Sequence, residues 1–487
     1  MDIGPVLRSL ATSARLPVKS TASDAMRVHV QAKQTAADTA GTPYMKAPTP
    51  VPVDAELQTS PGDVLRELGV ATTFLTRSRF LSIAQHWAHV RYCSTLRAGR
   101  GRLLALTRSA AREVVYHHKV AQSEQLGIGL ALIVARAVLH KRHPGWTFQA
   151  VDADVALRHG YIDDVTGEVR NEPGTKKRPD YFLVGRRTDG KRTDVRIVVL
   201  ECKGSHGGMR DIYKQLADAC LQVQTVAIGD HPLYGLMVAS RLAYTGVHSY
   251  VFDPPGDDEL WSGPSREFDE LMNQTPEEFS WRSGQLSPTA PQAEQPPDSA
   301  STPPSRATAP SHGSSGPIGA AAPYVIPDDR RTWLAQVLSR TTAASVLLFA
   351  GDSSTAAGYT TARQRDHNPG MLPLEEPWPD TISGQLRIPT GPVLNGTSYL
   401  MPLSGGRTLV MFRGIERRLH HALKEGNLQR YLRDAGRLHR WWRAHPQRPR
   451  ELLSVGTDGT ALLARVVNER VRPQSSGSRR TGRRPSQ

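Results

Sequence analysis

Apolar residues are spaced most regularly between residues 120 and 255, where the pattern predicts alternating helices and strands within a domain of residues 116–283. The segment SEQLGIGLALIVARAVLHKRHPG predicts one long, largely buried helix that ends before Pro144 and Gly145. Three predicted strands follow, in WTFQAVDADVALRHGYI, RPDYFLVGRR and DVRIVVLECKG. The third strand is apolar at nearly every position, so we expect it at the centre of its sheet. An amphipathic helix in MRDIYKQLADACLQVQTVA and strands in LYGLMVASRLA and VHSYVFDPP complete a mixed α/β layer.

The segments on either side of this layer have a different pattern. Residues 1–60 are rich in Ala, Thr, Pro and Ser with little apolar periodicity, which predicts a flexible arm. Residues 61–115 are periodic and basic, and their apolar spacing predicts an N-terminal helical region. Residues 284–323 form a low-complexity Pro/Ser/Ala segment, which we expect to be a disordered linker. Residues 471–487 predict a basic, disordered tail.

Beyond the predicted linker, residues 324–470 predict an accessory α+β region. The pattern indicates a helix near Trp333, an apolar strand in SVLLFAG and a hairpin in LLSVGTDGTALLARVV that turns at Asp458 and Gly459. A chain of 487 residues is too long for one compact core, so we expect two or three domains. The predicted fold class is therefore α/β, with a mixed sheet flanked by helices and an accessory α+β region after a disordered linker.

Charge and cysteine content narrow the possible partners and compartment. The formal net charge is +15, which favours a polyanionic partner, nucleic acid before anionic membrane. The three cysteines, Cys93, Cys202 and Cys220, form no CxxC pair and no zinc-binding spacing. We find no signal-peptide core and no apolar run of transmembrane length, so the sequence predicts a cytoplasmic protein with no membrane partner.

Three charged residues stand at the ends of two neighbouring predicted strands. Asp180 opens the strand in RPDYFLV, and Glu201 and Lys203 close the strand in VVLECKGS. Residues two apart on a strand point to the same face, so Glu201 and Lys203 are neighbours and Cys202 faces the other side. If the two strands pair as a hairpin, Asp180 reaches the same place. The sequence thus predicts two carboxylates and one ammonium at the edge of an apolar sheet.

This combination suits the hydrolysis of phosphodiester bonds. Carboxylates provide the hard oxygen ligands that Mg²⁺ or Mn²⁺ requires, and such an ion activates water and neutralises charge on the phosphate. A lysine beside them stabilises negative charge in the transition state.

The same residues resemble the PD-(D/E)xK nuclease superfamily. Pro179 and Asp180 match its PD, and Glu201-Cys202-Lys203 matches its ExK after an apolar strand. The resemblance covers about 140 residues. It implies a restriction-endonuclease-like fold and metal-dependent cleavage of nucleic acid, DNA more often than RNA. Asp180, Glu201 and Lys203 would be the catalytic residues.

The resemblance also implies roles for residues on the two neighbouring helices. The family often places an acidic residue on the preceding helix; Glu124 matches it here and would bind the metal with Asp180 and Glu201. Some members carry a Gln on the following helix, four residues before a Tyr. Gln215 matches the Gln, whereas Ala219 stands at the Tyr position. We expect Lys214 and Gln215 to contact nucleic acid. A role in restriction or defence against foreign DNA, with partner proteins of such a system, follows by analogy.

A second candidate for nucleic-acid contact is the basic stretch Arg413–Arg443. Its arginines outnumber its acids, and guanidinium groups are common phosphate ligands. The alternative is a solvated helix face that packs through its Leu and Trp residues. The candidate phosphate-binding residues are Arg417, Arg418, Arg430, Arg433, Arg437 and Arg440.

Three other interpretations remain open at this stage. Asp180, Glu201 and Lys203 could be an ordinary solvated cluster at the rim of a strand pair. The chain could be a nucleic-acid-binding or assembly protein that keeps the fold without turnover. FAGDSST resembles the nucleophile block of GDS-type esterases, with Ser353 as nucleophile, but no Asp-x-x-His follows it.

Overall fold

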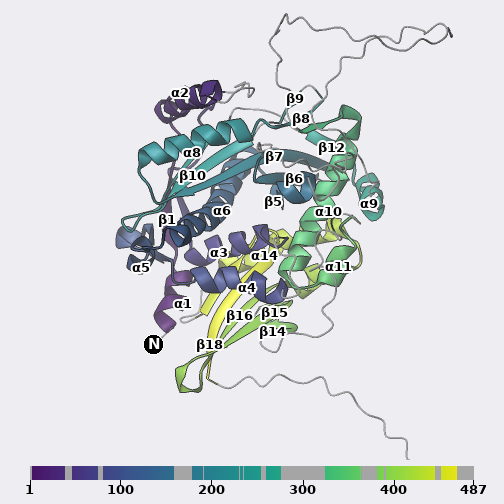
Figure 1. Cartoon of the computed structure of the whole chain (residues 1–487). Helices are drawn as coiled ribbons and strands as arrows, with labels where there is room; N and C mark the ends of the chain where they lie inside the picture. Colours follow the sequence, from purple (N-terminus) through teal and green to yellow (C-terminus); the bar gives the residue numbers. More distant parts are fainter. Residues whose placement is uncertain are drawn as a thin grey trace, which may run out of the picture.

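The computed structural model describes residues 3–38, 47–74, 81–157, 178–189, 191–229, 231–233, 235–253, 259–275, 324–361, 364, 381–388, 391–444 and 451–468. It has a mixed α/β architecture with two main sheets and helices packed on and between them (Figure 1). The mixed α/β class predicted from the sequence is confirmed. The predicted linker and tail lie outside the described residues.

The larger sheet contains eight strands in the order β2-β1-β11-β10-β7-β6-β5, and β12 also pairs with β7. The strand bounds are β1 Ala14–Lys19, β2 Glu56–Thr59, β5 Thr147–Asp152, β6 Tyr181–Asp189, β7 Arg192–Ser205, β10 Gly235–Arg241, β11 His248–Phe252 and β12 Glu259–Pro264. Strand β7 lies at the centre, as its continuous apolar run predicts. It pairs antiparallel with β6 and parallel with β10, so the sheet is mixed.

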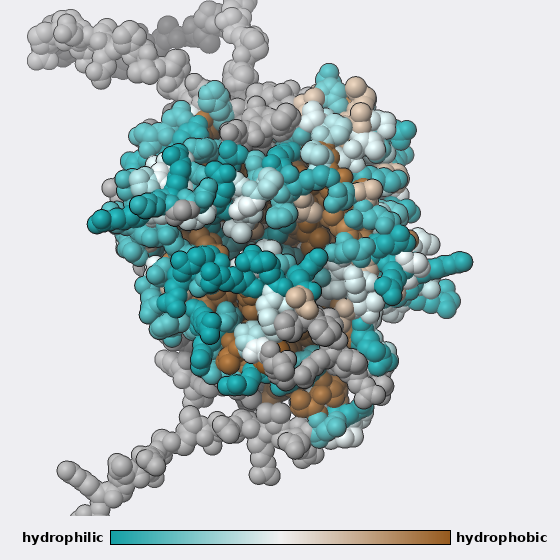
Figure 2. All heavy atoms as spheres, turned by 180° about the vertical axis from the view of Figure 1, so that it is seen from behind, coloured by the Kyte–Doolittle hydropathy of each residue, from teal (hydrophilic) through white to brown (hydrophobic). Residues whose placement is uncertain are grey.

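Helices cover both faces of this sheet. Helix α6, Tyr116–Arg142, packs its apolar side chains against one face, and α8, Met209–Gln222, against the other. Among the described helices, α6 alone is long and apolar enough to span a membrane by length and composition. Of that apolar stretch, 61% is buried inside the protein, which is the behaviour of a core helix. Hydrophilic residues cover most of the surface seen in Figure 2, with apolar ones between them.

The remaining helices lie along and between the sheets. Their bounds are α1 Gly4–Ala11, α2 Ala22–Asp38, α3 Pro61–Ala71, α4 Leu81–Tyr92, α5 Arg108–Ala111, α7 Ala153–Ala156, α9 Ser265–Asn273, α10 Arg331–Phe349, α11 Ser353–Ala357, α13 Arg417–Lys424 and α14 Leu428–Ala444. Two small sheets complete this part: β3 Leu96–Ala98 with β4 Leu104–Leu106, and β8 Val226–Ile228 with β9 His231–Pro232 and β13 Tyr324–Ile326.

The prediction of a flexible arm at residues 1–60 is wrong for the part that the structure describes. Strand β1 pairs parallel with β11 and antiparallel with β2, so the N-terminal segment is part of the large sheet. Leu7, Leu10 and Leu16 are fully buried in its core. Short strands whose partner is far away in sequence leave little local periodicity, which is why the pattern missed them.

The second sheet is antiparallel, in the order β14-β15-β16-β18-β17. Its strands are β14 Thr381–Arg387, β15 Val393–Pro402, β16 Thr408–Glu416, β17 Glu451–Val455 and β18 Thr460–Val467. Strands β17 and β18 form the hairpin predicted at Asp458 and Gly459. The strand predicted in SVLLFAG is wrong, since these residues end helix α10, which is buried along nearly its whole length. A helix buried on all sides has no amphipathic period, so its apolar run was mistaken for a strand.

The region after the predicted linker shares its hydrophobic core with the first part of the chain. Strand β13 pairs parallel with β8, and buried residues of α10 belong to the same cluster as those of α8. The second sheet packs Leu452 and Leu462 against Leu7 and Leu65 of the N-terminal helices. The described residues between 324 and 468 are therefore integrated with the large sheet and do not form an independent accessory domain.

This shared core predicts the behaviour of a nicked chain. A protease site inserted at residue 300 and cleaved should give two pieces that stay associated, because separation would expose the apolar surfaces of α10 and β13. Size-exclusion chromatography of the cleaved protein should show both pieces in one peak at the mass of the intact chain. Two separate, folded fragments would contradict the integrated fold.

Two glycines let α6 approach the end of β7. A Cβ at Gly127 would lie 2.8 Å from the backbone nitrogen of Gly204, and one at Gly204 would lie 1.9 Å from the carbonyl oxygen of Ser123. Real Cβ atoms do not come this close, so both positions require glycine. The contact fixes α6 directly against the residue that follows Lys203.

Gly127→Ala should therefore lower the free energy of unfolding by about 1–3 kcal/mol, because the helix must move away from β7. The matched control is Gly436→Ala in α14, where the only atom of the described residues outside the helix backbone that lies within 4 Å of a Cβ is Arg440 Nη1, at 3.5 Å. That variant should be unchanged or slightly more stable, since alanine favours helix. Urea unfolding of both proteins measures the difference, and equal stabilities would refute the close approach.

Candidate active site

The register of β6 and β7 places the three predicted residues together. Tyr181 pairs with Leu200, so Asp180 stands directly beside Glu201 at the end of the paired region. The side chains of Phe182 and Val199 pack in the cluster beneath α8, whereas Cys202 packs in the cluster beneath α6. Because strand residues alternate, Asp180, Glu201 and Lys203 share the face of α8. The predicted convergence of these three residues is thus present in the structure.

A closed set of contacts joins the three residues. Lys203 Nζ lies 2.5 Å from Glu201 Oε1. The other oxygen of Glu201, Oε2, accepts a hydrogen bond of 3.0 Å from the backbone N–H of Asp180. Asp180 Oδ2 accepts one of 2.8 Å from the backbone N–H of Cys202. Each strand therefore fixes the carboxylate of the other, and the geometry depends on the register.

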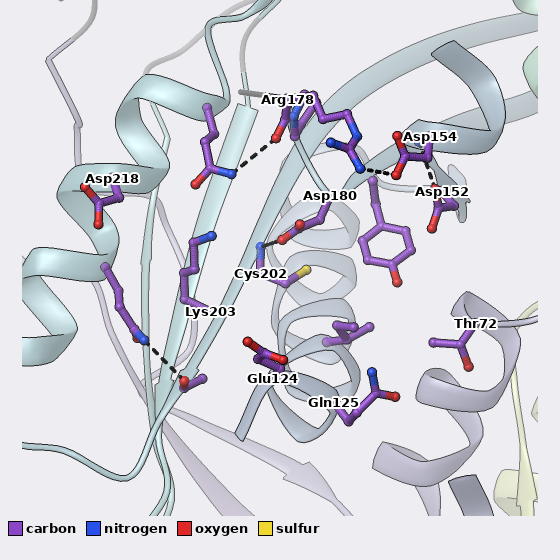
Figure 3. Close-up of a pocket in the computed structure, with 16 residues that line it drawn as sticks. Thr72, Glu124, Gln125, Asp152, Asp154, Arg178, Asp180, Cys202, Lys203 and Asp218 are labelled. Carbon is purple, nitrogen blue, oxygen red and sulfur yellow. Dashed lines mark hydrogen bonds and ion pairs between the residues drawn. The ribbon is translucent and has the colours of Figure 1, made fainter. Parts of the chain in front are cut away.

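Asp180 and Lys203 border a pocket of about 800 Å³ between α6 and α8. Figure 3 shows Asp180 and Lys203 on its wall, Asp218 on α8 and Glu124 on α6. Glu201 is fully buried behind the wall and does not line the pocket. The lysine thus stands between the buried glutamate and the open space.

The acids of this site are held in an unfavourable electrostatic environment. Burial, and secondarily the nearby charge of Asp180, raises the pKa of Glu201 well above its usual range. Burial also raises the pKa of Asp180, although the charge of Lys203 opposes the shift. Burial acts to lower the pKa of Lys203, but the two carboxylates outweigh it and raise that pKa. The site contains more acid than its one lysine compensates.

No family model, no curated protein and no solved structure matches this chain.

The pocket contains further charged residues that sequence reasoning missed. Asp152 ends β5 and its Oδ1 accepts hydrogen bonds from the backbone N–H groups of Asp154 and Val155. Asp154 forms an ion pair with Arg178, the residue two before Asp180 (Figure 3). The available signal was the pair of acids two residues apart in VDADV at the end of an apolar strand. Burial, and then the charge of Asp154, raises the pKa of Asp152 to about 7.

The remaining predicted residues fall into two groups. Gln215 lines the pocket and donates a hydrogen bond of 3.3 Å to the carbonyl oxygen of Gly204. Lys214, next to it on α8, is exposed and is not part of the pocket wall. The arginines of α13 and α14 do not line the pocket either, namely Arg417, Arg418, Arg430, Arg433, Arg437 and Arg440.

Helix α14 combines a charged face with a packed one. Arg433 and Arg437 both approach Asp434, at 3.4 and 3.3 Å, and Arg430 lies 3.6 Å from Glu425. Arg418 on α13 likewise lies 4.0 Å from Glu416, so four of the six predicted phosphate ligands have an acidic neighbour. Trp442 donates its indole N–H to the carbonyl oxygen of Leu453, which shows that it packs against β17.

The structure does not assemble an esterase site around Ser353. His420 Nε2 lies 2.7 Å from Asp352 Oδ2, and its Nδ1 lies 3.0 Å from the side-chain nitrogen of Asn395. Both ring nitrogens are therefore engaged. Within the described residues, no hydrogen bond joins His420 to Ser353, so the histidine is not placed to activate that hydroxyl.

A divalent cation fits the chemistry of the site, although its ligands are not grouped as in a formed metal centre. Within the described ranges, no three His, Cys, Asp or Glu side chains form a group that could hold a metal ion. The raised pKa values of Asp180 and Glu201 nevertheless reveal two acids whose negative charge is poorly compensated. A hard cation beside them would favour their ionised forms, and Glu124 faces the same pocket.

Asp152→Asn tests this electrostatic account through the pH dependence of stability. A raised pKa means that the folded protein binds a proton more tightly, so the wild type should lose stability as pH rises from about 4 to about 7. The stability of the variant should not fall in this way, because asparagine does not titrate. Asparagine can still accept the hydrogen bonds that cap α7. It should become more stable than the wild type by up to roughly 4 kcal/mol above pH 7. Urea unfolding in EDTA between pH 4 and 8 measures the gap, and parallel pH profiles would refute the raised pKa.

Proposed function

We propose that this protein is a metal-dependent nuclease with a restriction-endonuclease-like core, and that it hydrolyses phosphodiester bonds of nucleic acid, DNA favoured. The observation that carries the proposal is the interlocked set of Asp180, Glu201 and Lys203 at adjacent strand ends beside a large pocket. Order, spacing and register of these residues agree with the PD-(D/E)xK pattern. A net charge of +15 favours association with a polyanion.

The roles of the residues follow from their placement. Asp180 and Glu201 would hold Mg²⁺ or Mn²⁺, with Glu124 as a further oxygen ligand from α6. Such an ion activates water and neutralises charge on the phosphate. Lys203, on the same face, would stabilise the negative charge that develops on the phosphate oxygens. Gln215 lies on the wall beside Lys203 and would help to orient the substrate.

The proposed cellular location and role follow from the free cysteines and from the same resemblance. A cytoplasmic location agrees with the free thiols Cys93, Cys202 and Cys220. A nuclease of this type fits restriction or defence against foreign DNA, acting with partner proteins of such a system.

A second candidate is a nucleic-acid-binding or assembly protein that has the fold without turnover. The observation in its favour is that Glu201 is fully buried and lies 2.5 Å from Lys203, an ion pair that offsets part of its charge without a cation. In that case the three residues would stabilise the strand pair and the pocket would bind nucleic acid only.

Substitutions at the three residues separate these candidates. Asp180→Ala and Glu201→Ala should reduce cleavage at least about 100-fold while nucleic-acid affinity changes little, because binding uses many basic side chains and turnover requires the few groups that fix the metal. Lys203→Ala should reduce cleavage by about as much, because the negative charge that develops on the phosphate in the transition state is then left uncompensated.

The assay uses plasmid, single-stranded DNA and RNA with Mg²⁺, Mn²⁺ or EDTA. The matched control is Glu270→Gln, which neutralises an exposed carboxylate on α9, a helix that does not line the pocket. Full cleavage by the Glu201 variant would exclude this active site. Absence of metal-dependent cleavage in the wild type, with nucleic-acid binding retained, would favour the binding protein.

A further inference from the structure

An arginine-rich segment precedes α6, and neither the resemblance nor the proposed active site uses it. Residues 91–112 contain no Asp and no Glu. None of their arginines has an ion-pair partner within 4.0 Å in the described part of the chain, and all except Arg97 are exposed. The arginines of this segment are Arg91, Arg97, Arg100, Arg102, Arg108 and Arg112. This contrasts with α14, where acidic neighbours accompany the arginines.

The segment is a structured hairpin followed by α5. Strands β3 and β4 pair antiparallel, and the tip between them is Gly99-Arg100-Gly101-Arg102. Gly101 and Arg102 have φ of 63° and 58°, so the tip is tightly turned. Arg15 at the start of β1 donates from Nη2 to the carbonyl oxygen of Gly101 at 2.7 Å, which anchors the tip. In Figure 1 this segment lies at the left, where α5 stands beside β1.

Tyr244 provides an aromatic surface directly beside the hairpin. The residue is 48% exposed, and among the described residues few large apolar ones are exposed to this extent. The guanidinium of Arg97 lies 4.7 Å from the centre of its ring and covers one face. The backbone N–H of Leu106 donates to the carbonyl oxygen of Ala243 at 3.1 Å, so hairpin and tyrosine are fixed relative to each other.

Strand pairing, a hydrogen bond and a short stretch of chain connect this surface to the active site. Two residues beyond Lys203, Ser205 pairs with Arg241 at the end of β10. Arg241 donates from Nε to the carbonyl oxygen of Gly207 at 3.3 Å, and Tyr244 follows three residues later. Strand and chain geometry therefore places Tyr244 within about 20 Å of Lys203. This distance corresponds to a few nucleotides of an extended strand.

We propose that the Arg97–Tyr244 surface and the arginine tip bind single-stranded nucleic acid and lead it to the pocket; this inference rests on the proposed nuclease function. Arg100 and Arg102 contact phosphates. An unpaired base stacks on the exposed face of Tyr244, whose other face is held by Arg97. In a duplex the faces of the bases are covered by their neighbours, so this surface selects a single strand or an unpaired end.

The test measures binding in EDTA, so that cleavage does not interfere. The probes are a fluorescent 20-nucleotide single strand, the duplex of the same sequence, and vesicles containing phosphatidylserine. The variants are Tyr244→Ala, Tyr244→Phe and the double variant Arg100→Gln/Arg102→Gln. The control is Arg266→Gln, which removes an arginine that is 90% exposed and pairs with Glu270 on α9.

Tyr244→Ala should weaken binding of the single strand about 5- to 100-fold, whereas Tyr244→Phe keeps the stacking surface and should bind within about twofold of the wild type. The double arginine variant should lower the salt dependence of single-strand binding by about 1–1.5 in log–log slope, since each lost phosphate contact contributes about 0.7. The duplex should be affected less than the single strand, and Arg266→Gln should change neither. Tyr244 is exposed, so all variants should unfold at the temperature of the wild type.

Equal single-strand affinity of wild type, Tyr244→Ala and the double variant would overturn the proposal. If the variants lose as much affinity for the duplex as for the single strand, the proposed selectivity for single strands is wrong. If they lose affinity for the vesicles alone, the surface binds a membrane and not nucleic acid. If the wild type shows no cleavage but Tyr244→Ala loses the single strand, the nuclease proposal fails and this surface stands. If the wild type cleaves nucleic acid and the variants bind the single strand normally, the nuclease proposal stands and the proposed single-strand surface fails.

Discussion

The pairing of β6 with β7 is the constraint on which the candidate site depends. Shifting this register by one residue would turn Glu201 and Lys203 to the other face of the sheet and move Asp180 away from them. The register is specified by apolar side chains on both faces, since Phe182 and Val199 pack beneath α8 while Leu183 and Leu200 pack beneath α6. Burying a carboxylate costs several kcal/mol when it lacks compensation. The apolar packing of the two strands offsets this cost, and the ammonium group of Lys203, two residues from Glu201, provides a compensating positive charge.

The close contact of α6 with β7 adds a second constraint on the same place. Gly127 and Gly204 allow the helix backbone to touch the strand end, and Glu124 lies one turn earlier on this helix. Because the contact is between backbones, it fixes the backbone of Glu124 relative to that of Lys203. The pocket is bounded by secondary-structure elements on three sides, α6, α8 and the ends of β5 to β7. Preorganisation of this kind is what an active site or a selective binding site requires.

The strands and helices of the large sheet between residues 120 and 255 could be predicted from the sequence, because their apolar periods are local. Glu201 and Lys203 could be placed on one face by strand alternation alone, and Asp180 reaches them because the two strands pair as a hairpin, as expected from the sequence. Strand β1 could not, because its partner β11 lies more than two hundred residues away and its own six residues are too few to show a period. The helix in SVLLFAG was missed because uniform burial removes the amphipathic signal. Asp152 and Asp154 were missed because their relation to Asp180 arises from the pairing of β5 with β6.

The net charge does not show that the arginines of α14 and those of residues 91–112 have different surroundings. Arg430, Arg433 and Arg437 of α14 share their surface with Glu425 and Asp434, so the field at a distance is partly cancelled. The arginines of residues 91–112 have no acid in their own segment, and their hairpin stands at the sheet edge that also carries Lys203. An anionic strand approaching the molecule is attracted most where charge is uncompensated. The charge distribution and the geometry of the site therefore favour the same path for such a strand. It runs from the arginine tip through Tyr244 and Arg241 to Lys203.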